Sequence, residues 1–517
     1  MEDDLALIDR IVALLSSGGT DDMKEAAARA LQMLASNDNN QVAIAQAGAI
    51  GPLVALLSGG RTDGVKEAAA GALGNLSCSD DNAVAIERAG AIAPLVALLS
   101  GDETDCVKEE AARALLNLAL NDKNAVAIVR AGAIAPFAAL LSSGGTDGVK
   151  EAAAWALWNL AFNKDNAVAI ERVGAIAPLV ALLSGDGTDC VKEAAARALR
   201  NLAHNDNEVA IVRAGAIAPL VVLLSGGGTD GVKEAAAWAL GNLAVNDDNQ
   251  VAIALAGAIA PLVALISGFG TYGVKEAATG VLRNLAGNAD NEVAIVRAGA
   301  IGPLVALLSG DGTDSAKEQA ALALGNLACN ANGKVAIVLA GAIAPLVALL
   351  SAGGADGVME AAARALRNLA HNADNEVAIA LVGSIASLVA LLSGGGTDGV
   401  KEAAAWALAN LAHNDNEVAI VRAGAIAPLV ALMSGGGTDG VKEHAARAMV
   451  NIAANANNKV AIARAGAIDP LVALLDGGGT DGVKEQAARA LRNLGAEHHC
   501  THRRATKRER NDEARVM

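Results

Sequence analysis

The sequence predicts an all-α solenoid of about twelve copies of one unit. Near-copies of the segment from Gly215 to Ala256 fill almost the whole 517-residue chain. Anchored on the asparagine of A-L-x-N-L, the copies recur every 42 residues, twice every 41, with Met33 in the first copy and then Asn75, Asn117, Asn159, Asn201, Asn242, Asn284, Asn326, Asn368, Asn410, Asn451 and Asn493. A period of this length is typical of solenoids, in which stacked neighbours form the core.

Each copy divides into three predicted helices. In the copies around residues 215–257, a first helix over Asn249–Ala256 ends at Gly257, because glycine readily adopts the left-handed conformation that stops a helix. Pro219 is expected to open the second helix, where its missing N–H costs nothing. Thr229 or Asp230 can cap the third helix, whose buried stripe is predicted at Val232, Ala235, Ala236, Ala239, Leu240 and Leu243.

These residues resemble the armadillo repeat. The pattern G-A-I-x-P-L-V, then K-E-A-A-x-W-A-L-x-N-L-A, then N-x-x-V-A-I-x-x-A-G agrees in order and spacing over roughly residues 1–496. HEAT repeats are the nearest alternative, but their two-helix unit would not predict the short helix before the Gly-Pro corner. The resemblance implies a right-handed superhelix of three-helix units, with the third helices lining a concave groove.

The two ends of the chain depart from the repeat. The first copy is incomplete, because it begins inside a second helix at about Leu5–Leu15 and lacks the corner proline. Residues 497–517 are expected to form a basic, disordered tail. Its His498, His499, Cys500 and His502 are weak candidates for a metal, and Arg503–Arg510, with Thr506, is a candidate localisation signal, phosphosite or groove-binding segment.

Charge and composition limit the classes of partner. The formal net charge of −16 argues against nucleic acid, which needs a basic face, and favours a basic or mixed-charge polypeptide. Aromatic residues make up only 2% of the chain and alanine dominates the helix interiors, so a cavity for a small-molecule substrate is not expected. No cofactor or metal is predicted.

Compartment and membrane topology are predicted from cysteines and hydropathy. The five cysteines have no paired spacing, which suits a reducing compartment, and we expect a cytoplasmic or nuclear protein. Val251–Val274 and Val335–Ala355 carry no charge and are long enough to span a membrane. Both align in register with copies that carry arginine in the middle, so we predict repeat helices there and no transmembrane segment.

The candidate site lies along the third helices. Glu234, Trp238 and Asn242 are four residues apart and therefore share one helix face. The resemblance implies that such asparagines bind the backbone of an extended peptide while the tryptophans form slots for its side chains. A carboxamide offers both a donor and an acceptor, so amides that stand free in the groove could bind any extended chain. The alternative is that each amide satisfies main chain at a helix end.

Breaks in the repeat single out individual residues. Trp155, Trp158 and Phe162 share a face in the fourth copy, and Arg197 and Arg200 take the equivalent tryptophan positions in the next. Tryptophan and arginine dominate binding hot spots, although such a cluster can also simply fill space between copies. The predicted peptide-binding residues are Asn117, Trp155, Trp158, Asn159, Arg197, Asn201, Trp238, Asn242, Asn284, Trp406 and Asn410.

A non-catalytic scaffold for extended polypeptides is the function that these features favour. Residues for catalysis must be unique to one place, whereas this chain repeats nearly everything, so no enzyme is predicted. One alternative is a targeting subunit of a larger assembly, such as a ubiquitin ligase or a vacuole- or membrane-tethering adaptor. Another is a nuclear-import-type adaptor, although the chain lacks the consecutive Trp-Asn pairs and the basic N-terminal arm of that class.

Overall fold

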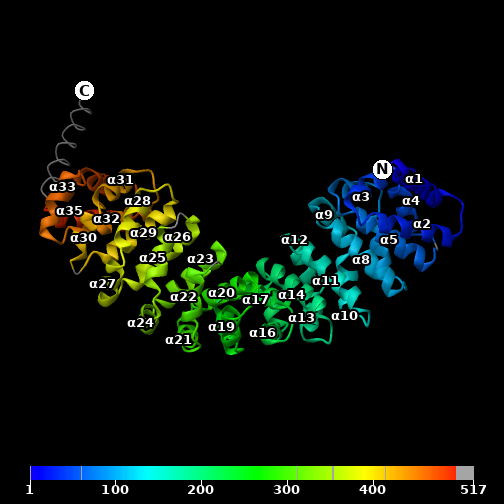
Figure 1. Cartoon of the computed structure of the whole chain (residues 1–517), viewed down its shortest axis with the longest axis horizontal. Helices are drawn as coiled ribbons and strands as arrows, with labels where there is room; N and C mark the ends of the chain where they lie inside the picture. The colour runs from blue at the N-terminus through cyan, green and yellow to red at the C-terminus, as the bar shows by residue number, and fades with distance from the viewer. Residues whose placement is uncertain (1, 60, 311, 352–353, 414, 496–517) are drawn as a thin grey trace, which may run out of the picture. The chain divides into compact units, whose positions relative to one another are not determined.

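The computed structural model describes residues 2–59, 61–310, 312–351, 354–413 and 415–495, and all regular secondary structure within these ranges is α-helical. The chain divides into two compact units, Met1–Pro261 and Leu262–Met517, called unit 1 and unit 2 below. Helices α1–α18 belong to unit 1 and α20–α35 to unit 2, and both runs can be followed by colour in Figure 1. The predicted all-α class is confirmed.

The helices follow the predicted three-helix unit. The third helices are α2 (Asp21–Leu34), α5 (Asp63–Leu76), α8 (Asp105–Leu118), α11 (Asp147–Leu160), α14 (Asp189–His204), α17 (Asp230–Leu243), α20 (Tyr272–Leu285), α23 (Asp314–Leu327), α26 (Asp356–Leu369), α29 (Asp398–Leu411), α32 (Asp439–Ile452) and α35 (Asp481–Leu494). The first helices are α3 (Asp38–Gln46), α6 (Asp80–Arg88), α9 (Asp122–Arg130), α12 (Lys164–Arg172), α15 (Glu208–Arg213), α18 (Asp247–Leu255), α21 (Ala289–Arg297), α24 (Ala331–Leu339), α27 (Ala373–Leu381), α30 (Asn416–Arg422) and α33 (Ala456–Arg464). The second helices are α1 (Glu2–Ser16), α4 (Ile50–Leu56), α7 (Ile92–Ser100), α10 (Ile134–Ser142), α13 (Ile176–Ser184), α16 (Ile217–Ser225), α19 (Ile259–Ser267), α22 (Ile301–Ser309), α25 (Ile343–Ser351), α28 (Ser384–Ser393), α31 (Ile426–Ser434) and α34 (Ile468–Asp476).

The corner between first and second helices differs slightly from the prediction. Gly215 has a φ of +81° and ends the turn after α15, as expected of glycine at this place. The second helix α16 begins at Ile217, two residues before Pro219. Proline remains in the first turn, where main-chain N–H groups have no partner within the helix, so it is tolerated there as well.

The start of the third helix is fixed by two side chains with separate tasks. The Thr229 hydroxyl accepts a hydrogen bond from the Val232 N–H at 3.4 Å and so caps α17. The aspartate that follows the threonine instead reaches the next copy, as Asp147 accepts a hydrogen bond from the Thr188 N–H at 2.8 Å. Equivalent aspartate–threonine bonds recur in both units, and they tie the loop of each copy to its predecessor.

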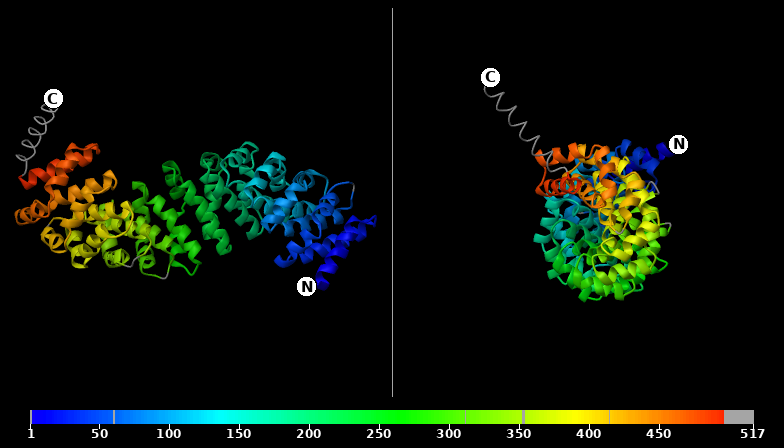
Figure 2. Two further views of the ribbon diagram at one scale, coloured as in Figure 1. Left: turned by 90° about the horizontal axis from the view of Figure 1, so that it is seen from above. Right: turned by 90° about the vertical axis from the view of Figure 1, so that its left-hand side faces the viewer.

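Third helices form the spine of each unit. In unit 1, α2, α5, α8, α11, α14 and α17 pack consecutively, and in unit 2 α20, α23, α26, α29, α32 and α35 do the same. Figure 2 shows the helices of each unit from two further sides in the colours of Figure 1. The predicted stripe of α17 is confirmed, because Val232, Ala236 and Leu240 are fully buried. Alanine at most of the contact positions lets neighbouring helices approach closely, and the leucines fill the remaining space.

The predictions about membrane-spanning segments and free cysteines can be compared with the described residues. Among them no single helix has the length and apolar character needed to cross a membrane, while eight helix pairs bent by 78–82° meet those criteria only jointly. Cys78, Cys106, Cys190 and Cys329 are free and exposed. The predictions for Cys500 and for the rest of the tail, including its histidines and Arg503–Arg510, fall outside the described residues.

Candidate functional site

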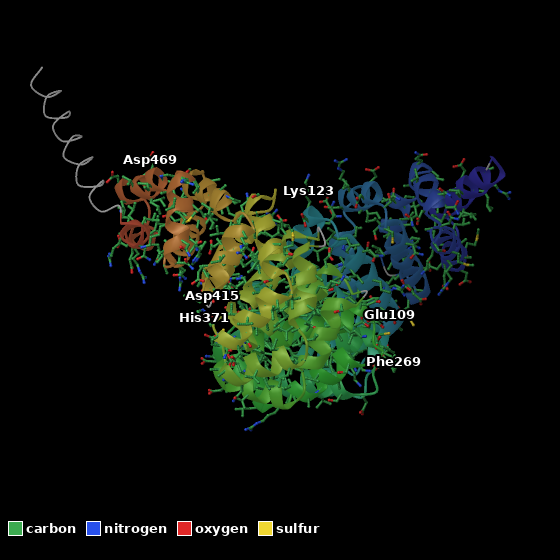
Figure 3. All side chains as sticks on the ribbon, turned by 60° about the vertical axis from the view of Figure 1, so that its left-hand side comes forward. Glu109, Lys123, Phe269, His371, Asp415 and Asp469 are labelled. Carbon is green, nitrogen blue, oxygen red and sulfur yellow. The ribbon has the colours of Figure 1, made fainter. Side chains whose placement is uncertain are left out.

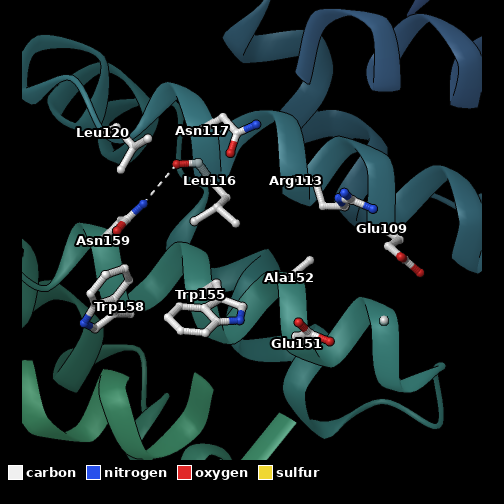
Figure 4. Close-up of a pocket in the computed structure, with 11 residues that line it drawn as sticks. Glu109, Arg113, Leu116, Asn117, Leu120, Glu151, Ala152, Trp155, Trp158 and Asn159 are labelled. Atoms are coloured by element: carbon white, nitrogen blue, oxygen red, sulfur yellow. Dashed lines mark hydrogen bonds between the residues drawn. The ribbon is translucent and has the colours of Figure 1, made fainter. Parts of the chain in front are cut away.

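A pocket of about 550 Å³ opens between the third helices α8 and α11 of unit 1. We call it the Trp155 pocket (Figure 4). It is lined by Glu109, Arg113, Leu116, Asn117, Leu120, Gly148, Glu151, Ala152, Trp155, Trp158 and Asn159. Four of the eleven predicted peptide-binding residues, Asn117, Trp155, Trp158 and Asn159, therefore meet in one place.

Helical spacing puts the polar and aromatic groups on one wall. Glu151, Trp155 and Asn159 are four apart along α11, so their side chains rise along the same face, and Figure 4 shows them in that order. On the opposite wall, Glu109, Arg113 and Asn117 repeat this spacing along α8. The pocket therefore offers acidic groups at one end, an indole in the middle and amides at the other end.

Aromatic rings form a connected cluster at the amide end. Trp155 and Trp158 meet edge to face with ring centroids 5.1 Å apart, and Trp158 meets Phe162 in the same way at 5.3 Å. Phe162 is 65% exposed, so the cluster continues from the pocket to the surface. On the side of the next copy, the Arg197 guanidinium carbon lies 5.7 Å from the Trp155 ring and Arg197 pairs with Glu193 at 2.9 Å. Part of the cluster thus packs between copies.

Negative charge at the acidic end is partly compensated by the fold. The Glu109 carboxylate lies against Gly148 in the first turn of α11, where any side chain at position 148 would overlap it. This placement stabilises the negative charge, because the start of a helix carries a partial positive charge. Beside the pocket, burial raises the pKa of the neighbouring Glu110. Arg113 is exposed and is the cationic residue among those that line the pocket.

The expectation that the asparagine amides stand free is wrong. Ten of the amides donate an Nδ2–H bond of 2.7–3.1 Å to a main-chain oxygen of the preceding third helix: Asn75 to Gln32, Asn117 to Gly74, Asn159 to Leu116, Asn201 to Trp158, Asn242 to Arg200, Asn326 to Arg283, Asn368 to Gly325, Asn410 to Arg367, Asn451 to Ala409 and Asn493 to Val450. These carbonyls lie at helix C-termini, whose last groups have no partner within the helix. The row is therefore a capping ladder between copies.

Capping restricts but does not abolish the predicted binding role. Each amide has two N–H donors and one acceptor oxygen, and the ladder uses one donor; the Asn117 nitrogen also donates to the Cys78 Sγ at 3.7 Å, which leaves its acceptor oxygen. Asn159, Asn201 and Asn410 are buried, whereas Asn117 and Asn242 are half-buried. The Asn284 oxygen already accepts hydrogen bonds from the Arg283 guanidinium, the shorter at 2.7 Å. Asn117 therefore offers the more accessible amide in the Trp155 pocket.

Loss of one ladder bond should be visible as lost stability. We expect Asn451→Ala to cost about 1–2 kcal/mol of unfolding free energy, because it leaves the Ala409 oxygen without its cap. Urea unfolding followed by circular dichroism measures this. Met33→Ala is the matched control, since Met33 holds the same position in α2 and is 77% exposed. Equal effects of the two substitutions would refute the capping role.

Trp238 and Trp406 have neighbours that Trp155 lacks. The guanidinium carbon of Arg200 lies 4.8 Å from the Trp238 ring centroid, and that of Arg367 lies 4.1 Å from the Trp406 ring centroid. His444 also stacks on Trp406 at 4.0 Å with an interplanar angle of 17°. Two groups this close to one ring must lie on its opposite faces, so Trp406 has no free face for a ligand. The structure does not bring Trp406 and Asn410 into the Trp155 pocket.

The imidazole of His444 is buried and lies near positively charged side chains. Its pKa is lowered to about 4, first by burial and then by Arg447 and Arg367. Glu402 is the nearest acid, with 3.9 Å between its Oε1 and the His444 Nε2. His371, labelled in Figure 3, contacts the Asn410 amide at 3.2 Å. Its pKa is also lowered, mainly by burial. His444 takes a position that is alanine in most copies, and sequence reasoning missed it.

Among the described residues, no group of three or more histidine, cysteine, aspartate or glutamate side chains is placed to hold a metal ion. Some glutamates of the third helices pair with an arginine four residues later on the same helix, as Glu360 does with Arg364 at 3.5 Å. These pairs neutralise part of the acidic charge along the third helices.

Comparison with known families settles the kinship of the chain. The Armadillo/beta-catenin-like repeat matches residues 37–78, 121–162, 204–245, 246–287, 288–329, 330–371, 374–413, 413–454 and 455–496, which is more than half of the sequence. The chain belongs to the armadillo repeat family. Armadillo repeat proteins are generally non-catalytic scaffolds for protein interactions, and the predicted solenoid of about twelve repeats agrees with this family.

Solved structures add two similar chains. The armadillo chain is 33% identical to an engineered protein of known crystal structure, with a TM-score of 0.64. The match covers 86% of this chain and 98% of the engineered protein. A second engineered protein is 33% identical with a TM-score of 0.43, over 46% of this chain and 98% of that one. No curated protein matches the sequence.

Proposed function

We propose that this armadillo protein is a non-catalytic scaffold that binds an extended polypeptide segment, basic or mixed in charge, at the Trp155 pocket. The observation that carries the proposal is the open space of about 550 Å³ in front of Trp155, with amides at one end and carboxylates at the other. An extended chain presents unpaired N–H and C=O groups that carboxamides can bind. An indole face can bind an aliphatic stem or a cation.

The charge of the pocket supports a cationic guest. Glu109 and Glu151 line one end of the pocket and outnumber Arg113, and the whole chain carries a formal net charge of −16. A long basic side chain could lay its stem on Trp155 and direct its head toward the acidic end. The Asn117 amide would then face the guest's main chain at the other end. All the groups that this binding mode needs already line the pocket.

A direct binding measurement tests this function. The probe is a fluorescein-labelled peptide of about ten residues in which arginine alternates with alanine, so that all arginines of an extended strand point to one side. We expect saturable binding by fluorescence anisotropy, weakened by salt because the contacts are partly ionic. The control peptide carries glutamate in place of arginine and should bind at least tenfold more weakly. Equal affinity for the two peptides, or binding of neither, would reject the proposal.

A further inference from the structure

The three tryptophans at the same third-helix position face different residues of the preceding copy. The residue just before the ladder asparagine is Leu116 ahead of Trp155, Arg200 ahead of Trp238 and Arg367 ahead of Trp406. In each case the tryptophan follows 38 or 39 residues later. Since consecutive third helices pack side by side, this residue lies on the side of its helix that faces the tryptophan of the next copy.

Arginine at this position covers the indole. The guanidinium carbons of Arg200 and Arg367 lie 4.8 Å and 4.1 Å from their tryptophan centroids, within the range of a cation–π contact. Both arginines are half-buried, and this burial is the largest cause that lowers the pKa of each guanidinium. Leucine cannot make such a contact, and Leu116 lines the open Trp155 pocket.

We infer that Arg200 and Arg367 act as built-in plugs. Each guanidinium occupies the indole face of the next copy's tryptophan, where the cationic side chain of a guest would otherwise bind. This inference rests on the proposed function and adds to it a residue that decides which sites are open. Of the three tryptophans, Trp155 is then the one whose face toward the preceding copy is left for a guest.

The plugs give a repetitive protein a single binding register. Copies that are nearly identical would let an extended chain bind equally well after sliding by one repeat. Helices pack about 10 Å apart, so such a slide moves the guest by about three residues of extended chain. Because arginine covers the faces of Trp238 and Trp406 that point toward the preceding copy, a guest cation on that side gains an indole contact at Trp155 but not at the other two tryptophans, and the other registers lose that contact.

Removal of a plug should open a second site. In Arg200→Leu, position 200 carries the residue found in front of the open pocket, and Trp238 becomes accessible. We expect stronger acrylamide quenching of tryptophan fluorescence and about fivefold tighter binding of the arginine–alanine peptide, which can span the roughly 20 Å between Trp155 and Trp238. Arg283→Leu is the matched control, because Arg283 holds the same place but is followed by Leu322 in the tryptophan position.

The converse variant closes the pocket. Leu116→Arg should place a guanidinium against Trp155 and weaken peptide binding at least tenfold, while Val222→Arg, which adds the same charge at an exposed position of α16 away from the residues that line the pocket, should weaken it far less. The plug hypothesis is overturned if Arg200→Leu changes neither quenching nor affinity, or if Arg283→Leu has the same effect. The quenching measurement needs no peptide and therefore tests the Arg200 plug alone. If the wild-type chain fails to bind the peptide, the proposed function is rejected, but the quenching result still shows whether Arg200 covers Trp238.

Discussion

We expect Trp155→Ala to lower the affinity for the arginine–alanine peptide at least tenfold. Trp155 forms the middle of the pocket wall, between the carboxylate of Glu151 and the amide of Asn159 (Figure 4). Its removal takes away the aromatic surface on which a long basic side chain would pack. Buried tryptophan contacts at binding sites commonly contribute about 2 kcal/mol or more, and about 1.4 kcal/mol already corresponds to tenfold in affinity. Fluorescence anisotropy titration measures the loss.

Two controls separate lost contact from lost structure. Trp155→Phe keeps an aromatic face and should retain most of the affinity, whereas a purely structural role would respond to the change in ring size. Val222→Ala changes a side chain that is 67% exposed on the second helix α16, away from the residues that line the pocket, and should leave binding unchanged. If Trp155→Ala binds the peptide as tightly as the wild-type chain, the pocket is not the binding site.

We expect acid to weaken the fold through His444. Its pKa in the folded chain, about 4, lies below the ordinary histidine value of 6.5, so the unfolded chain takes up the proton first as pH falls. The stability that depends on a neutral His444 is therefore complete above about pH 6.5 and is lost between that value and about 4. At pH 5 the loss amounts to about 2 kcal/mol. Burial and the positive charges of Arg447 and Arg367 oppose protonation of the ring, which stacks on Trp406.

The alanine variant provides the comparison. His444→Ala installs the residue that Ala403 holds at the same place in the preceding copy, and it should show a smaller loss of stability between pH 8 and pH 5 than the wild-type chain. Urea unfolding at the two pH values gives both differences. His371 and all carboxylates are present in both proteins, so their contributions cancel in the comparison. Identical losses would show that His444 does not control the acid sensitivity.

The repeat made most of the fold predictable. The glycine corner and the apolar stripe recur with the same period in about twelve copies, so an ambiguous signal in one copy can be read from the others. The observed helices follow the predicted unit, including the incomplete first copy. The start of the second helix was missed by two residues, because proline is compatible with any position of a first turn.

The candidate site was less predictable than the fold. Spacing along α11 grouped Trp155 with Trp158 and Phe162, and the spacing of Trp238 and Asn242 implied the same face for Trp155 and Asn159; of these, Trp155, Trp158 and Asn159 line the pocket. It could not reveal that each amide is committed to the preceding helix, because that bond joins residues about 43 positions apart. The contacts of the plugs also join neighbouring copies, so the spacing within one helix does not show them. The sequence does contain a signal for them, because an arginine directly before the ladder asparagine is followed 38 or 39 residues later by a tryptophan.

Site-specific cross-linking tests most directly whether a polypeptide occupies the Trp155 pocket. A photoreactive benzoylphenylalanine replaces either Leu120, which lines the pocket, or Val222 on α16, and both native side chains are 67% exposed. After irradiation with the arginine–alanine peptide, mass spectrometry identifies the linked residues. The account predicts peptide attached at position 120, competed away by unlabelled peptide, and little attachment at position 222. Equal attachment at the two positions, or attachment at 222 alone, would contradict it.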